Sequence, residues 1–527
     1  MKDYVFGASI LENLTTGMYQ DSKVIYREYI QNSCDQIDKA IALGITAEDD
    51  AKIEIWLNES ERSIVIEDNA TGIKAADFEK TLGNIADSDK KIGEDKGFRG
   101  IGRLCGLAYC SKLVFETSTK GEDTISILTC DAQKMRRMIE ESDHGTKRSA
   151  NEILDEINRF QTIQTADIDS HYFKVELIKI NQENTDLLNS HAIRDYLAFV
   201  VPVEYQNAFI FRKKVYGHAF DLGLKIDEYN IRLEGEQVLK KYVTDLKNSQ
   251  NVKWDEIFEI EFKDFFDHEG NLIAWMWFGL TQFNGIIPNS KSNPSNPMRG
   301  IRLRKENIQI GGEDALQKLF KEDRGNSYFV GEVFAVSKAL IPNSQRDYFN
   351  ENGTRLLFEK QLKQFFCEHL DKVYRTSSQI NSAYKKIDAF EKKAAEYKEL
   401  SSTGSFVNEE QRGRVEVELK QAEEAAKKAQ ASITGIKKKN SPDDLIGRVI
   451  ERIERSHDPL GIADEQAPPK PDDKKNNKTQ WRTDGGKYSA FSKNERKLIS
   501  RILGIITANT DKETSSHIIK KIEEDLQ

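Results

Sequence analysis

An acid, an amide and a second acid recur at helical spacing near the start of the chain, and this pattern constrains the fold more than any other. Glu28, Asn32 and Asp35 stand at positions i, i+4 and i+7, which places all three side chains on one face of a helix. An ordinary amphipathic helix with solvated polar residues would give the same pattern. The motifs that follow in the chain therefore decide between the two interpretations.

Two glycine-containing motifs follow this predicted helix. A strand-like run ends at Asp68 and leads into the turn at Gly72, and Gly97-Phe98-Arg99-Gly100-Ile101-Gly102 comes later, before another apolar run. The order excludes a Rossmann dinucleotide site, in which the glycine motif follows the first strand and an acid follows the second. Glycines spaced in this way free backbone N–H groups, which favours a loop that surrounds phosphate at the start of a helix.

The ordered set resembles the nucleotide site of the GHKL ATPases, which include gyrase, MutL, histidine kinases and the ninety-kilodalton heat-shock chaperones. The resemblance covers roughly residues 1–365 and is closest to the heat-shock chaperones and to MORC-like bacterial ATPases. A segment from Ala76 to Ser88 is similar to the one that leads into the mobile lid of those chaperones, but Thr81 stands where they carry Asn. Many members also carry Gly-Thr before a late strand, whereas this chain has His171-Tyr172 there.

The resemblance implies ATP and Mg²⁺ as cofactors and gives each matching residue a role. Glu28 is expected to polarise the attacking water, and Asn32 to bind Mg²⁺ through its carbonyl oxygen. Asp35 is a further candidate for a nucleotide contact. Asp68 is expected to accept a hydrogen bond from the exocyclic amine of adenine, with Gly72 leaving room for the base. The expected phosphate contacts are Gly97, Arg99, Gly100, Ile101 and Gly102.

One basic residue far along the chain is expected to complete the site. The run from Leu340 to Asp347 resembles the chaperone loop that brings an Arg from the middle domain to the γ-phosphate, and Arg346 matches that Arg. A cation supplied in this way stabilises transition-state charge and couples hydrolysis to domain closure. The alternative is a surface Arg paired with Asp347. Other basic residues of the same region are expected to be solvated, namely Arg302, Arg304 and Lys305.

The whole chain is predicted to be an α+β protein built from several parts. Residues 1–205 are expected to form a GHKL ATP-binding domain, an α/β sandwich, and residues 206–365 a second mixed α/β transducer domain. The Ala/Glu/Lys/Gln-rich residues 366–455 predict a helical hairpin. A Pro/Asp/Lys/Asn-rich stretch, 456–486, predicts a flexible linker. Two capping boxes within 487–527 predict a C-terminal helical segment for dimerisation.

Composition narrows the functional classes. Charged residues make up 31% of the chain and no run of eighteen apolar residues occurs, so a cytoplasmic protein without membrane contact is expected. The five cysteines include no CxxC pair, which predicts reduced and mostly buried thiols. The net charge of −9 does not indicate a nucleic-acid surface for the whole chain. A local basic groove is compatible with that charge.

The leading functional hypothesis is an ATPase that acts as an ATP-dependent conformational clamp, chaperone-like, working as a homodimer on a protein client. A second hypothesis is a DNA-binding clamp of the MORC or MutL type. A third is an ATP-switched regulator of an effector partner in a bacterial antiviral defence system. A histidine kinase is not expected, because no helix with a phospho-acceptor His precedes the site. Gyrase-like DNA cleavage is not expected, because nothing resembles its acidic metal cluster.

Overall fold

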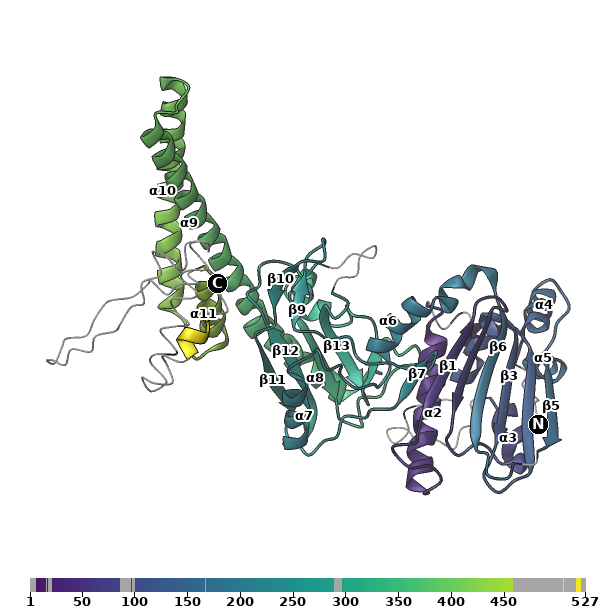
Figure 1. Ribbon diagram of the computed structural model, residues 1–527. Coiled ribbons are helices and arrows are strands. Elements are labelled where there is room, and N and C mark those ends of the chain that lie inside the picture. The colour runs from purple at the N-terminus through teal and green to yellow at the C-terminus, as the bar shows by residue number, and fades with distance from the viewer. Residues whose placement is uncertain are drawn as a thin grey trace. The chain divides into compact units, whose positions relative to one another are not determined.

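The computed structural model divides the chain into two compact units, residues 1–459 and residues 460–527. The first unit holds an N-terminal sheet, a second sheet and a long helical region, which confirms the predicted α+β fold (Figure 1). The residues that the structure describes are 6–15, 17, 21–85, 96, 100–165, 167–288, 296–457, 506 and 518–522.

The N-terminal sheet has eight strands in the order β5-β4-β3-β6-β2-β1-β7-β8. All neighbouring pairs are antiparallel except β1 and β7, which are parallel. Two of these strands, β7 and β8, follow residue 205, where the sequence predicts a domain boundary. The bounds are β1 (Ile53–Asn58), β2 (Ser63–Asp68), β3 (Cys110–Ser118), β4 (Thr124–Asp131), β5 (Asn158–Gln164), β6 (Tyr172–Ile180), β7 (Ile231–Leu233) and β8 (Glu236–Gln237).

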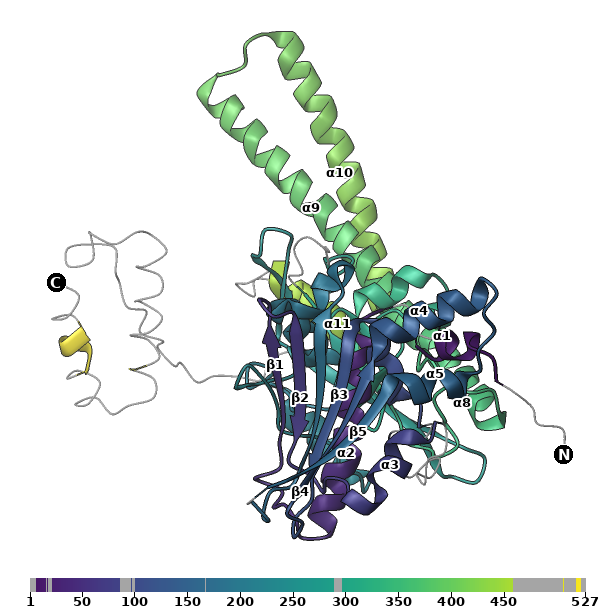
Figure 2. The same ribbon diagram turned by 90° about the vertical axis from the view of Figure 1, so that its right-hand side faces the viewer.

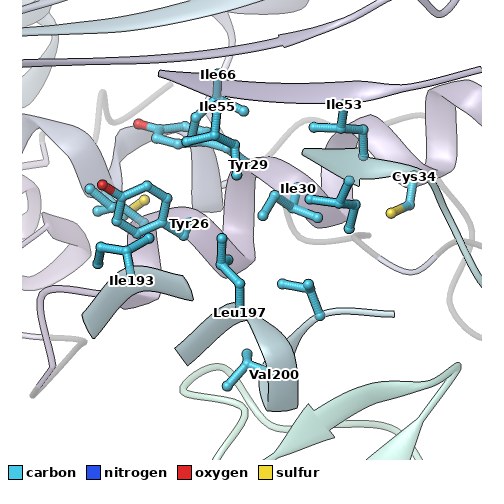
Figure 3. Close-up of a cluster of buried hydrophobic side chains, with 14 of the residues drawn as sticks. Tyr26, Tyr29, Ile30, Cys34, Ile53, Ile55, Ile66, Ile193, Leu197 and Val200 are labelled. Atoms are coloured by element: carbon cyan, nitrogen blue, oxygen red, sulfur yellow. The ribbon is translucent and has the colours of Figure 1, made fainter. Parts of the chain in front are cut away.

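The helix predicted from the acid–amide–acid pattern is α2 (Val24–Ala42), and it lies between the N-terminal sheet and α6 (Ser190–Val200). Figure 3 shows Tyr29 and Ile30 of α2 among isoleucines of β1 and β2, with Leu197 of α6 on the other side. This apolar packing fixes the rotation of α2 about its axis, so its polar face is also fixed. The remaining helices of this part are α1 (Ser9–Thr15), α3 (Ala75–Gly83), the 3₁₀ helix η1 (Gly102–Ala108), α4 (Ala132–Asp143), α5 (Ala150–Ile157) and the 3₁₀ helix η2 (Gln182–Leu188).

The second sheet has five strands in the order β11-β12-β15-β13-β14. Strand β12, the second in this order, is buried at nearly every position, which explains its continuous apolar run. Helix α7 (Arg212–Asp221) and the ribbon β9 (Asp245–Lys247) and β10 (Lys253–Glu256) precede it. The other bounds are β11 (Glu259–Phe266), β12 (Leu272–Leu280), β13 (Gly300–Lys305), β14 (Ile308–Ile310), η3 (Gln317–Leu319), η4 (Asp323–Tyr328) and β15 (Val330–Ala335).

The basic residues of β13 are buried, so the expectation of solvated side chains at Arg302, Arg304 and Lys305 is wrong. Arg304 is fully buried and forms an ion pair with Glu332 of β15. Its Nη2 also donates to the carbonyl oxygen of Phe199 in α6 at 2.8 Å. The strand therefore uses a charged side chain to join the second sheet to a helix of the first part.

Further buried polar groups surround this ion pair. Lys240 Nζ lies 3.4 Å from Glu332 Oε1 and donates to Asn307 Oδ1 at 2.7 Å. Tyr205 and Trp277 donate to the same carboxylate, the indole at 3.1 Å. Every one of these groups has a partner, as buried polar atoms require. We call the set of Tyr205, Lys240, Trp277, Arg304, Asn307 and Glu332 the junction network.

A helical hairpin follows the second sheet, as predicted, and Figure 2 shows its two long helices side by side. The first arm runs from α8 (Gly353–Phe365) through the π-helical turn η5 (Phe366–Leu370) into α9 (Asp371–Thr403), and it ends at Gly404, whose φ is +63°. Asn408 caps the returning helix α10 (Glu409–Lys437). A shorter helix, α11 (Leu445–His457), packs against α9.

Most of the predicted linker (456–486) and dimerisation segment (487–527) lies outside the described residues, so both stay predictions. In the second unit the structure describes a short helical stretch, residues 518–522, with Ile519 buried. All five cysteines are free thiols and four are buried, as expected. Among the described helices, none is both long and apolar enough to cross a membrane.

Candidate functional site

A cavity of about 980 Å³ lies beside the polar face of α2. Its size falls in the range of small-molecule sites. Glu28, Asn32 and Asp35 all line it, so the helical spacing brings the three side chains to one place. The other predicted residues that line it are Asp68, Gly72, Gly100, Ile101, Gly102 and Arg346. Gly97 and Arg99 lie outside the described residues.

The Glu28 carboxylate is held on both sides. Its Oε1 accepts from Arg27 Nη2 at 3.0 Å and from Arg27 Nε at 3.3 Å. On the other side, a Cβ on Gly102 would lie 2.5 Å from Glu28 Oε2. Glycine at position 102 therefore leaves the space that this oxygen occupies. The third glycine of the motif contributes to the site through the acid as well as through its own backbone.

Asp35 contacts the residue that precedes the glycine motif. Its Oδ1 accepts from the backbone N–H of Lys96 at 2.8 Å. The Lys96 ammonium pairs with Asp38 at 2.7 Å and lies 3.5 Å from Asp227, and Tyr229 donates to Asp38 from the same segment. The polar face of α2 thus fixes Lys96 through both its backbone and its side chain. Lys96 could not be predicted as a site residue from the sequence, because no periodic signal separates it from the charged residues before it.

Asp68 stands at the end of β2 with 2% of its surface exposed. Burial raises the pKa of its carboxyl to about 7, against the hydrogen bonds that it accepts from the Ser33 hydroxyl and the Ala70 N–H. Phe173, which carries no hydroxyl, lies opposite it in β6. The hydroxyl that supports Asp68 therefore comes from α2. Ser33 could have been found from its place directly after Asn32.

Gly72 is required by the backbone itself. Its φ is +63°, which L-residues with a side chain rarely adopt. A Cβ there would lie 1.9 Å from the carbonyl oxygen of Ser118 at the end of β3. From the sequence alone, Gly72 is expected to leave room for the base of the nucleotide. The structure adds a reason that holds without any ligand.

Arg346 reaches the cavity from the segment between β15 and α8. It is buried rather than placed on the surface, and its Nη2 donates to the carbonyl oxygen of Lys96. Its φ of +55° is unusual for a residue with a side chain, and such backbone strain is concentrated at functional sites. Next to it, the carbonyl oxygen of Gln345 accepts from Arg27 Nη2 at 3.3 Å. The loop therefore contacts the neighbour of Glu28 as well as Lys96.

The glycine motif leads into a 3₁₀ helix of seven residues, η1 (Gly102–Ala108). This helix has little room to extend, because β3 begins at Cys110. Gly106 inside η1 lies against α2, and a Cβ there would lie 2.4 Å from the Tyr29 hydroxyl, to which Gly106 N–H donates at 3.1 Å. Close packing of η1 on α2 brings Gly100, Ile101 and Gly102 to the cavity.

The lining fits a nucleotide in its chemistry. Asp68 provides a buried hydrogen-bond acceptor in one part of the cavity. Glu28, the glycine backbone and Arg346 line other parts of the same cavity. Among the described residues, no group of three His, Cys, Asp or Glu side chains could hold a metal by itself. Asn32 offers one oxygen ligand, which suits Mg²⁺ because that ion takes most of its other ligands from phosphates and water.

Comparison with known proteins adds a family to this geometry. Residues 20–165 match the model of the histidine kinase-, DNA gyrase B- and HSP90-like ATPases. Chaperone protein HtpG of Orientia tsutsugamushi is 27% identical over 168 residues, which are 26% of this chain and 27% of the relative. HtpG of Helicobacter hepaticus is 27% identical over 132 residues, 22% of this chain and 21% of the relative. The chain thus spans about a quarter of the length of these relatives.

Proposed function

We propose that the chain is an ATP-driven conformational clamp with a chaperone-like role, because residues 20–165 match the family model that includes the HSP90-like ATPases and resemble HtpG chaperones. ATP binding closes the protein and slow hydrolysis reopens it. One observation carries this proposal: Arg346 lines the same cavity as Glu28 and Asp68 although it comes from beyond the second sheet. The contact between Arg27 and Gln345 joins residues 318 positions apart.

In this proposal, Asp68 recognises the adenine base. An ionised carboxylate accepts a hydrogen bond from the exocyclic amine of adenine, whereas guanine presents a carbonyl at that position. The Ser33 hydroxyl and the Ala70 N–H already bond the Asp68 carboxylate and hold its orientation. In this proposal Asp68 selects ATP over GTP, and Ser33 acts as a positioning residue.

In the same proposal, Glu28 and Arg346 catalyse hydrolysis. Arg27 and the space beside Gly102 hold the Glu28 carboxylate in one orientation, from which it can align a water molecule and take up its proton. The guanidinium of Arg346 would stabilise the negative charge that develops on the transferred phosphoryl group. Asn32 would hold Mg²⁺, which neutralises phosphate charge when it is bound.

The loop that carries Arg346 couples hydrolysis to the arrangement of the two sheets. It bonds to Arg27, the neighbour of Glu28, and to Lys96, the residue that precedes the glycine motif. A shift of the second sheet would therefore move Arg346 relative to Glu28. We extend the proposal to a homodimer that contacts itself through residues 487–527 and acts on a protein client.

Two substitutions test the division between base recognition and hydrolysis. Asp68→Asn should weaken ATP binding by about 10- to 100-fold, the scale of losing a hydrogen bond to a charged group. Glu28→Ala should bind ATP with near wild-type affinity and lose about 100- to 10,000-fold in kcat. Calorimetry and a phosphate-release assay on both variants are the measurements. An equal loss of affinity in the two variants would contradict the assigned roles.

A further inference from the structure

A second hollow, of about 520 Å³, lies at the base of the helical hairpin. Residues of α9, α10 and η4 line it, and it shares no lining residue with the ATP cavity. Four of its lining side chains are cations, namely Arg324, Arg375, Lys386 and Lys428. Among the described residues that line it, none carries a carboxylate.

Two of these cations are compensated and two are not. Glu322, at the edge of the hollow, pairs with Arg324 at 2.6 Å and with Arg375 at 2.7 Å, and Asp371 lies 3.8 Å from Arg375. Lys386 and Lys428 have no ion-pair partner in the part of the chain that the structure describes. Excess positive charge therefore remains inside the hollow.

Two exposed lysines elsewhere on the hairpin pair with nearby acids. Lys427 pairs with Glu423 at 2.6 Å and Lys393 with Glu418 at 2.7 Å. Such pairs at helical spacing or across a helix pair are the usual surface arrangement. Lys428 directly follows a paired lysine and faces a hollow without any acid.

Neutral groups complete the lining. Tyr328 and Tyr374 are buried and their rings stack at 4.4 Å with an angle of 18° between planes, which gives the hollow a rigid wall. Ser378 and Ser432 add hydroxyl donors. Guanidinium, ammonium and hydroxyl donors around one space are the groups that bind phosphate oxygens.

We propose that this hollow binds phosphate, either in the backbone of a nucleic acid or in a free polyphosphate. Both ligands carry the same charged oxygens, and the volume accepts more than a single ion. The uncompensated ammonium groups of Lys386 and Lys428 are the principal contacts. This inference does not depend on the ATPase proposal, because the two cavities share no residue. A nucleic-acid ligand would favour the clamp that encloses DNA over the one that encloses a protein client.

The test compares two double variants of the full-length protein that change net charge equally. Lys386→Glu with Lys428→Glu reverses the charge inside the hollow. Lys385→Glu with Lys420→Glu is the matched control on the same two helices, because neither residue lines the hollow. Excess ADP keeps the nucleotide cavity occupied throughout. The probes are a fluorescein-labelled single-stranded DNA of about 20 nucleotides, followed by anisotropy, and tripolyphosphate, followed by calorimetry.

The first double variant should bind at least about tenfold more weakly than wild type, and the control should bind within about twofold. Binding of tripolyphosphate alone would identify a free polyphosphate as the ligand, and binding of both probes would identify a nucleic acid. Failure of wild type to bind either probe, or equal loss in the two double variants, would overturn the proposal. Unchanged thermal melting of all variants, and the same result from Lys386→Ala with Lys428→Ala, would exclude misfolding as the cause.

Discussion

Two buried carboxylates in this protein have opposite electrostatic properties. Asp68 in the nucleotide cavity and Glu332 in the junction network are both almost fully buried. Burial raises the pKa of Asp68 to about 7. Burial would also raise the pKa of Glu332, but the charges of Arg304 and Lys240 lower it to about 2.

The difference lies in the partners. Glu332 accepts from a guanidinium, an indole and a phenol and lies beside an ammonium group, so its charge is compensated within the protein. Asp68 receives hydrogen bonds only from neutral groups among those that act on its pKa. An incompletely compensated carboxylate facing a cavity is suited to bind a ligand, whereas a compensated one is suited to hold elements together.

Removing each charge should therefore change stability in opposite directions. Glu332→Gln leaves Arg304 and Lys240 buried without a counter-charge and should lower the free energy of unfolding by about 3–5 kcal/mol. Asp68→Asn removes a carboxylate whose burial is unfavourable and should leave stability unchanged or raise it at pH 8. Urea denaturation of both variants is the measurement. A similar loss of unfolding free energy in the two variants would contradict the distinction between a ligand-binding and a structural carboxylate.

The pH dependence should follow the raised pKa of Asp68. A raised carboxyl pKa means that the ionised acceptor is lost as the pH falls through about 7. ATP affinity should then decrease by up to about tenfold per pH unit below 7, because the ionised carboxylate accepts from the amine more strongly than the neutral acid does. The stability advantage of Asp68→Asn should shrink over the same fall in pH, since protonation relieves the buried charge. Calorimetry and urea denaturation between pH 8 and pH 6 measure both effects, and flat profiles would contradict them.

The smallest expected effect concerns Ser33. Its hydroxyl lowers the pKa of Asp68, so Ser33→Ala should move the midpoint of the affinity profile to higher pH. At pH 7 the loss of ATP affinity should stay under about tenfold, the scale of one hydrogen bond. Ser22→Ala is a suitable control, because Ser22 is half-buried and its hydroxyl donates to Asp186 instead. An unchanged midpoint would mean that Ser33 does not act through Asp68.

The spacing of residues in the sequence was sufficient to predict the parts of the site that lie on a single helix or strand. Glu28, Asn32 and Asp35 follow from helical geometry, and the strands follow from their period of two. The junction network could not be predicted in this way, because Arg304 and Phe199 are 105 positions apart. A basic residue in a strand is usually solvated, and only the packing of two sheets shows that Arg304 is buried.

The same limit applies to the contacts of Lys96 and to strand β7 near the edge of the N-terminal sheet. Lys96 gains its role from Asp38 and Asp227, which approach it from two other segments. Strand β7 pairs in parallel with β1 over three residues, Ile231–Leu233, and such a short run gives no clear periodic signal. Gly72 illustrates a further limit, since its clash with Ser118 depends on where β3 ends.

We propose that Arg346 completes the ATP site from the second part of the chain. The direct measurement is kcat and ATP affinity of Arg346→Ala, with Asp347→Asn as the neighbouring control, because Asp347 accepts from Asn343 instead. We expect near wild-type affinity and a kcat lowered by roughly 10- to 1000-fold for Arg346→Ala, the scale of one transition-state cation. We expect little change in either quantity for the control. Wild-type turnover in Arg346→Ala would contradict the claim.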